Sequence, residues 1–354
     1  PLPGAATTEP RPQPPAWISR QGMRGLWTAA PPRGLDSLLD FTDAAGINAL
    51  ATVVPVSALA ESLAPARQGG MRIGPRSAWQ LTAERLQATS LRWFPAIAPT
   101  TIPSAGADEV DRHGNLAAAP CALDSVFWRD ALRPALRTLA RLGGAGPEVI
   151  TGIALDLTPI ADGYGGLGFC DADYRVGLAA LSQAVDSTQH AALAALPPVA
   201  RYQTLLRLGL LDPYYAALEA AVAERAAALR AELRRLHPEL RFAFRGPGGP
   251  GEAGAAAADW LSLGLMRGFS TRDLPVFLWL NGGAAGGGGG GRALLTRYRR
   301  RGIWAVSAIG LDPRRLPLGA WRRLGPLVFG EHDGFWLSAA SADTVSRLIR
   351  RLVR

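Results

Sequence analysis

The sequence predicts a protein of the α/β class: a (β/α)8 or TIM barrel with a helical insertion between strands four and five. Short apolar runs rich in β-branched and aromatic residues alternate with longer segments whose apolar residues recur every three or four positions. Eight strand-like runs are present, and eight parallel strands close such a barrel. The runs are apolar almost throughout, which is typical of strands covered by helices. A doubly wound open sheet is the competing architecture.

The predicted strands are short and most are followed within a few residues by Gly, Pro, Asp or Asn, which favour turns. In chain order they span residues 23–29, 47–54, 91–98, 149–155, 241–245, 274–280, 302–308 and 334–338. Helices are predicted at 35–45, 77–89, 125–142, 216–236, 256–268, 293–301, 314–324 and 342–353. The insertion, residues 181–236, is predicted to form two helices that break at Pro197 and Pro198.

The first residues form a Pro-rich tract that lacks the apolar residues of a core. We expect residues 1–20 to be a disordered segment left after removal of a secretory signal, and residues 21–354 to be one barrel domain. This predicts a secreted, periplasmic or cell-surface protein. Cys121 and Cys170 are the two cysteines, and the sequence permits either a disulfide between them or two separate thiols.

All 38 basic residues are arginine, and they outnumber 29 acidic residues to give a net charge of +9. The arginines occur in nearly every predicted outer helix and rarely at strand ends. We therefore interpret them as solvent-exposed residues whose abundance reflects codon bias. No nucleic-acid partner is expected. An anionic polymer bound by residues 299–301 and the basic C-terminal segment is the alternative. No apolar run reaches the roughly 18 residues that span a membrane.

The residues most able to carry chemistry follow the fourth predicted strand. Asp156 ends that strand, and the glycine-rich loop behind it holds Asp162 and Tyr164. Barrels of this type place their functional residues at the C-terminal ends of the strands. We therefore expect Asp156 to lie in the functional site.

Residues 152–156, with the loop that leads into Phe169, Cys170 and Asp171, resemble the fourth βα unit of secreted glycoside-hydrolase-like barrel proteins. The resemblance extends to residues 24–27, 43–48 and 333–336. It implies a carbohydrate substrate and carboxylate chemistry. The chain departs from the pattern where such barrels carry Asp-x-Glu, because Thr158 stands in place of the glutamate.

Glycoside hydrolysis normally needs two carboxyl groups about 5 to 10 Å apart. No other predicted strand ends in Asp or Glu, so the second group has to come from a loop, and Asp162 is our choice. The other loop candidates are Asp108, Glu109, Asp111, Asp171 and Asp173. Asp171 is expected to cap a helix, and residues 331–333 are expected at the opposite, N-terminal face of the barrel with a structural role.

Aromatic and polar residues near strand ends supply the predicted sugar contacts. Trp27 and Trp279, with Tyr164, are the predicted stacking platform, while packing in the barrel core is the alternative for each tryptophan. Arg245 and Asn281 are predicted to orient the substrate.

Other chemistries find little support. The four histidines lie far apart in the sequence, which disfavours a zinc site. There is no Gly-x-Ser-x-Gly motif, the GYGGLG stretch at 163–168 is not followed at once by a helix, and the glycine tract at 282–291 lacks the Lys of a phosphate-binding loop. We expect no cofactor and no metal.

Two functions therefore stay open. The chain is predicted to act on or bind an extracellular polysaccharide through acid/base carboxylate chemistry. Alternatively, it is a catalytically decayed barrel that serves as a structural or glycan-binding subunit of an extracellular assembly.

Overall fold

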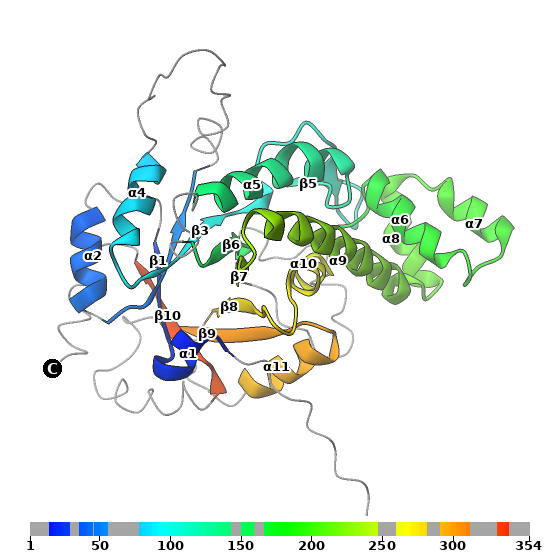
Figure 1. Cartoon of the computed structure of the whole chain (residues 1–354). Helices are drawn as coiled ribbons and strands as arrows, with labels where there is room; N and C mark the ends of the chain where they lie inside the picture. Colours follow the sequence, from blue (N-terminus) through cyan, green and yellow to red (C-terminus); the bar gives the residue numbers. More distant parts are fainter. Residues whose placement is uncertain are drawn as a thin grey trace, which may run out of the picture.

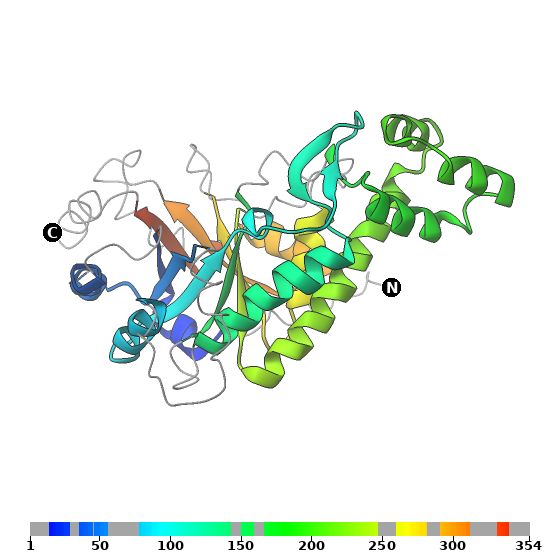
Figure 2. The same ribbon diagram turned by 90° about the horizontal axis from the view of Figure 1, so that it is seen from above.

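Eight parallel strands close a barrel in the computed structural model, which describes residues 14–28, 35–44, 46–55, 78–142, 150–158, 166–246, 260–281, 291–311 and 331–339 (Figures 1 and 2). The strands are β1 (Met23–Thr28), β2 (Ala49–Val53), β3 (Arg92–Ile97), β6 (Gly152–Asp156), β7 (Arg241–Arg245), β8 (Val276–Leu280), β9 (Ala305–Leu311) and β10 (Gly334–Ala339). Each pairs with the next, and β10 pairs with β1. The predicted barrel is confirmed and the open sheet is wrong.

Helices follow most strands and lie outside the barrel (Figure 2). They are α2 (Leu35–Ala44), α4 (Ala78–Gln87), α5 (Arg133–Leu142), α10 (Trp260–Phe269) and α11 (Gly291–Arg300), with a π-helical turn, η2 (Phe127–Leu132), leading into α5. The helices predicted at 314–324 and 342–353 lie outside the described residues. Among the helices that the structure describes, none is long and apolar enough to cross a membrane.

A short helix that was not predicted from the sequence, α1 (Ala16–Gln21), precedes the first strand. Ile18 on this helix is buried, and the Trp17 ring stacks on Phe277 of β8 with a centroid separation of 5.9 Å. The last residues of the segment expected to be disordered therefore pack against the N-terminal end of the barrel.

The insertion contains one helix more than predicted. After α6 (Asp171–Leu181) come α7 (Ser187–Ala194), α8 (Pro198–Arg207) and α9 (Leu211–Leu236). Pro198 begins α8, as expected of a proline in the first turn. The unpredicted break lies at Gly209, whose φ of 67° is favourable for glycine. Helices α7 and α8 project from the barrel, whereas α9 runs beside α5 and α10 (Figures 1 and 2).

The barrel interior combines large aromatic side chains from some strands with alanines from others. Trp27, Phe94, Phe277, Trp279 and Trp336 form one buried cluster with alanines of β2, β3, β6, β7 and β9. This alternation of large and small side chains fills the space to the density of a protein interior. Glycine occurs where a strand backbone lies directly against an aromatic ring: a Cβ added to Gly25 would lie 2.8 Å from the indole of Trp279.

Two further differences concern strands. An antiparallel hairpin, β4 (Asp108–Val110) and β5 (Leu116–Pro120), occupies the loop after β3 and was not predicted. The seventh barrel strand begins at Ala305 and ends at Leu311, three residues later at each end than the predicted 302–308. The hairpin tip packs on α8, since a Cβ at Gly114 would lie 2.6 Å from the Val199 backbone.

Candidate functional site

An ion pair occupies the C-terminal ends of two neighbouring barrel strands. Asp156 ends β6 and Arg245 ends β7, and the parallel register places them side by side. The Arg245 Nη1 atom donates to Asp156 Oδ2 at 3.3 Å. Thr158 donates its backbone N–H (3.0 Å) and hydroxyl (2.6 Å) to Oδ1. Asp156 is thus held as a hydrogen-bond acceptor on both oxygens.

The guanidinium of Arg245 lies over two tryptophan rings. Its central carbon is 4.8 Å from the ring centre of Trp27 and 5.3 Å from that of Trp336. A cation over an indole face is attracted by about 0.5 to 2 kcal/mol, more as water is excluded. The side chain keeps 22% of its surface exposed. Arg245 is therefore fixed at the mouth of the barrel and still reachable from solvent.

Three tryptophans pack together beneath this guanidinium. The ring centres of Trp27 and Trp279 are 5.5 Å apart, and those of Trp279 and Trp336 are 5.9 Å apart. The Trp336 indole N–H donates to the Leu280 carbonyl at 3.0 Å. The indole nitrogens of Trp27 and Trp279 and the Nε of Arg245 are buried with no hydrogen-bond partner among the described residues. Buried donors are usually paired, so three such atoms in one cluster are unusual.

The structure brings four predicted site residues together: Asp156, Arg245, Trp27 and Trp279. Trp27 is 2% exposed and Trp279 is fully buried. Neither indole offers a face to solvent, so their predicted sugar-stacking role stays a prediction that requires the mouth to open. Asn281 is exposed just after β8.

Asp162 and Tyr164 lie outside the described residues. The predicted pairing of Asp162 with Asp156 therefore stays a prediction, as does the stacking role of Tyr164.

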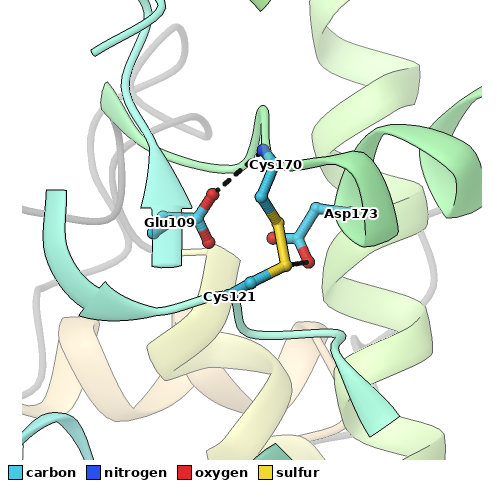
Figure 3. Close-up of side chains that lie close together, drawn as sticks. All are labelled: Glu109, Cys121, Cys170 and Asp173. Carbon is cyan, nitrogen blue, oxygen red and sulfur yellow. Dashed lines mark hydrogen bonds between the residues drawn. A yellow bond between two sulfur atoms is a disulfide. The ribbon is translucent and has the colours of Figure 1, made fainter. Parts of the chain in front are cut away.

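Two other loop carboxylates form a buried pair (Figure 3). Glu109 lies on β4 and Asp173 in the first turn of α6, and both are inaccessible to solvent. Glu109 accepts four backbone N–H groups, those of Val110, Ala122, Gly168 and Cys170 at 3.0 to 3.3 Å. Its oxygens are occupied by the backbone, which assigns it a structural role.

Burial raises the pKa of Asp173 well above its usual value, and the negative charge of Glu109 raises it further. Burial also raises the pKa of Glu109, although its backbone donors partly offset the effect. Oδ1 of Asp173 accepts the Leu123 N–H at 2.8 Å, while Oδ2 accepts from no described donor. Burial and the charge of Glu109 therefore both favour the neutral form of Asp173.

Cys121 and Cys170 form a disulfide next to this pair (Figure 3). Of the two alternatives open from the sequence, the structure contains the bonded one. The ligand-type atoms of Glu109, Cys121, Cys170 and Asp173 lie within 4.8 Å of one another. Sulfur in a disulfide is not a thiolate, the form that binds metals. In the disulfide form this cluster therefore joins two loops rather than offering a metal site.

Asp171 does not cap its helix. Cys170 occupies the N-cap position of α6, and Asp171 is the first helical residue. Its carboxylate pairs with Arg201 Nη2 at 2.6 Å. The same guanidinium donates to the Phe169 carbonyl and lies 4.4 Å from the ring centre of Tyr174, whose pKa burial raises to about 12. Asp171 thereby ties α6 to α8.

Glu331, His332 and Asp333 lie at the N-terminal end of the barrel, as predicted. The Asp333 carbonyl accepts the N–H of Met23 at the start of β1, and its carboxylate accepts that of Ser307. His332 is buried and hydrogen-bonded to Ser307 at 3.0 Å. A pocket of about 560 Å³ borders His332 and Asp333 on this side, with α1 as another wall.

Comparison with known proteins identifies the fold. No protein-family model and no curated protein sequence matches the chain. The β-galactosidase from Rahnella sp. R3 superposes with a TM-score of 0.55 and 12% identity, covering 94% of this chain and 56% of that one. This chain shares the (β/α)8 barrel fold of that enzyme.

Two further β-galactosidases give similar values. The enzyme from Marinomonas ef1 has a TM-score of 0.52 and 10% identity, covering 90% of this chain and 54% of its own. The enzyme from Halorubrum lacusprofundi has a TM-score of 0.52 and 12% identity, covering 90% and 52%. The chain thus spans about half the length of these enzymes. At such identities the similarity concerns the fold alone.

Proposed function

We propose that this glycoside-hydrolase-like barrel binds a polysaccharide or glycan at the C-terminal ends of its strands, with Asp156 and Arg245 contacting the sugar. The observation that carries the proposal is their ion pair at the mouth of the barrel, next to a tryptophan cluster. Barrels place functional residues at this end, and a paired carboxylate and guanidinium offer both acceptors and donors to sugar hydroxyls. The fold shared with β-galactosidases makes a sugar the first ligand to test.

Binding is tested with a glycan array followed by calorimetry on the hits. Arg245→Met and Asp156→Asn should each weaken binding about tenfold or more, since each removes a charge-assisted hydrogen bond. Arg207→Met is the matched control, because Arg207 on α8 is exposed and its hydrogen bond goes to Thr204 of the same helix. Equal affinity in the wild type and the three variants would show that the glycan binds elsewhere. If the wild type bound no glycan at all, the proposal would be rejected.

Hydrolysis is the second candidate function. Asp156 stands at the end of the fourth strand with both oxygens accepting hydrogen bonds, an arrangement suited to a nucleophile or charge stabiliser rather than a proton donor. Asp162 would then be the acid. Release of reducing sugar by the wild type, lost in both Asp156→Asn and Asp162→Asn, would support hydrolysis. Retained glycan binding without turnover would favour the decayed barrel.

Export and membership of an extracellular assembly belong to the same proposal. Supporting export are the Pro-rich first residues and the disulfide between Cys121 and Cys170, a bond typical of oxidising compartments. Mass spectrometry of protein from cell fractions, alkylated without reduction, tests this. We expect the two cysteines to escape alkylation in protein recovered outside the cytoplasm.

A further inference from the structure

Thr158 hydrogen-bonds to only one of the two carboxylate oxygens of Asp156. Its backbone N–H and its hydroxyl both donate to Oδ1, at 3.0 and 2.6 Å. A carboxylate oxygen has two lone-pair sites, so Thr158 uses both sites of Oδ1. Oδ2 accepts a single hydrogen bond, from Arg245 at 3.3 Å. The two oxygens therefore differ, because Oδ2 alone retains the capacity to accept from a further donor.

The contact between Asp156 and Arg245 is single, although carboxylates and guanidinium groups frequently form two parallel hydrogen bonds. The paired arrangement matches the two planar groups and is the stronger one. The register between β6 and β7 already places the two residues side by side. The oxygen that would complete the paired arrangement is Oδ1, and it is hydrogen-bonded to Thr158 instead.

The Thr158 side chain is itself held by the end of β7. A Cβ added to Gly246, the residue after Arg245, would lie 2.5 Å from the Thr158 methyl carbon, so this methyl group packs directly on the glycine. The single hydrogen of the hydroxyl is used in the bond to Asp156. Rotation of the Thr158 side chain would therefore break a hydrogen bond and a packing contact together.

Resting on the proposed function, we infer that Thr158 is a positioning residue of the glycan site and keeps the pair of Asp156 and Arg245 open, with one hydrogen bond between the two groups. Oδ2 of Asp156 and the exposed part of the Arg245 side chain, 22% of its surface, then stay available to sugar hydroxyls, which both donate and accept. The terminal torsion of an aspartate is broad. Without the Thr158 hydroxyl, the carboxylate turns and closes a two-bond pair with the guanidinium.

Crystal structures of the unliganded protein show the geometry of the pair without any sugar. Thr158→Val keeps the shape of the side chain and removes the hydroxyl, whereas Thr158→Ser keeps the hydroxyl and removes the methyl group. We expect one hydrogen bond between Asp156 and Arg245 in the wild type and in Thr158→Ser, and two in Thr158→Val. Thr158→Ala also lacks the hydroxyl and replaces the valine variant if that protein does not fold. A single hydrogen bond in the variant without the hydroxyl would overturn the inference.

Calorimetry measures the consequence for binding. The probe is β-1,4-galactotriose, or the tightest-binding oligosaccharide of the glycan array if that is another. Thr158→Val should bind it about threefold to tenfold more weakly than the wild type, because closing the pair withdraws an acceptor and a donor from the sugar. Thr158→Ser should bind it as the wild type does. Thr296→Val is the matched control, since the exposed Thr296 hydroxyl donates to the Arg292 carbonyl of its own helix at 2.9 Å.

The two threonine variants separate positioning from packing. Wild-type affinity in Thr158→Val, or a loss of affinity in Thr158→Ser alone, would overturn the inference and leave the proposed function standing. A wild type that binds no glycan would reject the proposed function and with it the role of Thr158 in glycan binding.

Discussion

Glu109 and Asp173 lie together in the interior although they come from segments that follow different barrel strands, and the negative charge of Glu109 raises the pKa of Asp173. The hairpin β4–β5 supplies one carboxyl and α6 the other. The disulfide between Cys121 and Cys170 links the same two segments. The pair is therefore a structural device rather than the second carboxylate of a hydrolase, although the sequence offered both residues as candidates.

The raised pKa of Asp173 predicts a pH-dependent stability. In the unfolded chain Asp173 has its usual pKa, about 3.8, whereas burial raises its pKa well above that value in the folded chain. Below about pH 4 both forms are protonated and the full stability is present. As the pH rises further, only the unfolded chain releases the proton, so stability falls until the folded pKa is passed, by up to about 1.4 kcal/mol per pH unit.

Asp173→Asn tests this, because the amide copies the protonated carboxyl in size and in its ability to donate to Glu109. Denaturant unfolding between pH 4 and 9 should show a flatter profile and higher stability than the wild type at pH 8. Asp130→Asn, at an exposed position, should leave the profile unchanged. A variant whose stability depends on pH as steeply as that of the wild type would contradict the raised pKa of Asp173.

Removing the disulfide should destabilise the barrel. The bond closes a loop with a sequence separation of 49 residues, which corresponds to about 4 kcal/mol in the chain-entropy treatment. Urea unfolding of a Cys121→Ser, Cys170→Ser double variant measures this loss. If reduction of the wild type left its unfolding midpoint unchanged, the bond would contribute nothing to the fold.

Gly25 is predicted to be intolerant of alanine. An added Cβ would meet the Trp279 ring at 2.8 Å inside a packed barrel, and overpacking of this kind costs about 1 to 3 kcal/mol. A Cβ added to Gly166 would have no atom within 4 Å, and this residue has no positive φ, so Gly166→Ala is the matched control. Thermal unfolding should separate the two variants clearly, and equal midpoints would argue against the tight contact.

Glu219 is predicted to hold two elements onto α9. It is largely buried and pairs with Arg267 and Arg301, each at 3.0 Å. Because both arginines are about one third exposed, we expect Glu219→Gln to cost about 1 to 2 kcal/mol, less than a fully buried pair. Chemical unfolding measures this loss of stability, with Asp130→Asn, which removes an exposed ion pair, as the control. The control variant should have the same free energy of unfolding as the wild type.

The barrel was predictable from the sequence because its strands are nearly continuous apolar runs. The helices of the insertion were harder to count, since the break at Gly209 lies within a pattern that continues on both sides. The hairpin β4–β5 was missed because its strands are short and built mostly from residues that are uncommon in strands: β4 is Asp-Glu-Val and β5 is Leu-Ala-Ala-Ala-Pro.

The site was predictable only in part. Asp156 and Arg245 were found because each ends a strand, but their pairing depends on the register between β6 and β7, which no local pattern specifies. Trp336 was not predicted as a site residue, because its contact with Arg245 joins strands that are not adjacent in the barrel. The pairing of Glu109 with Asp173 is a long-range contact between loops, and sequence spacing carries no sign of it.

The glycines that face indoles in the barrel interior bear on how such sequences diverge. Gly25 faces Trp279, and a Cβ on Gly310 would lie 2.8 Å from the Trp336 ring. In each pair a larger residue can replace the glycine only if a smaller residue replaces the tryptophan, because the total volume is fixed. Homologues of this chain should therefore change positions 25 and 279 together, and likewise 310 and 336, so that an ancestral substitution at one position sets which residues its partner can accept.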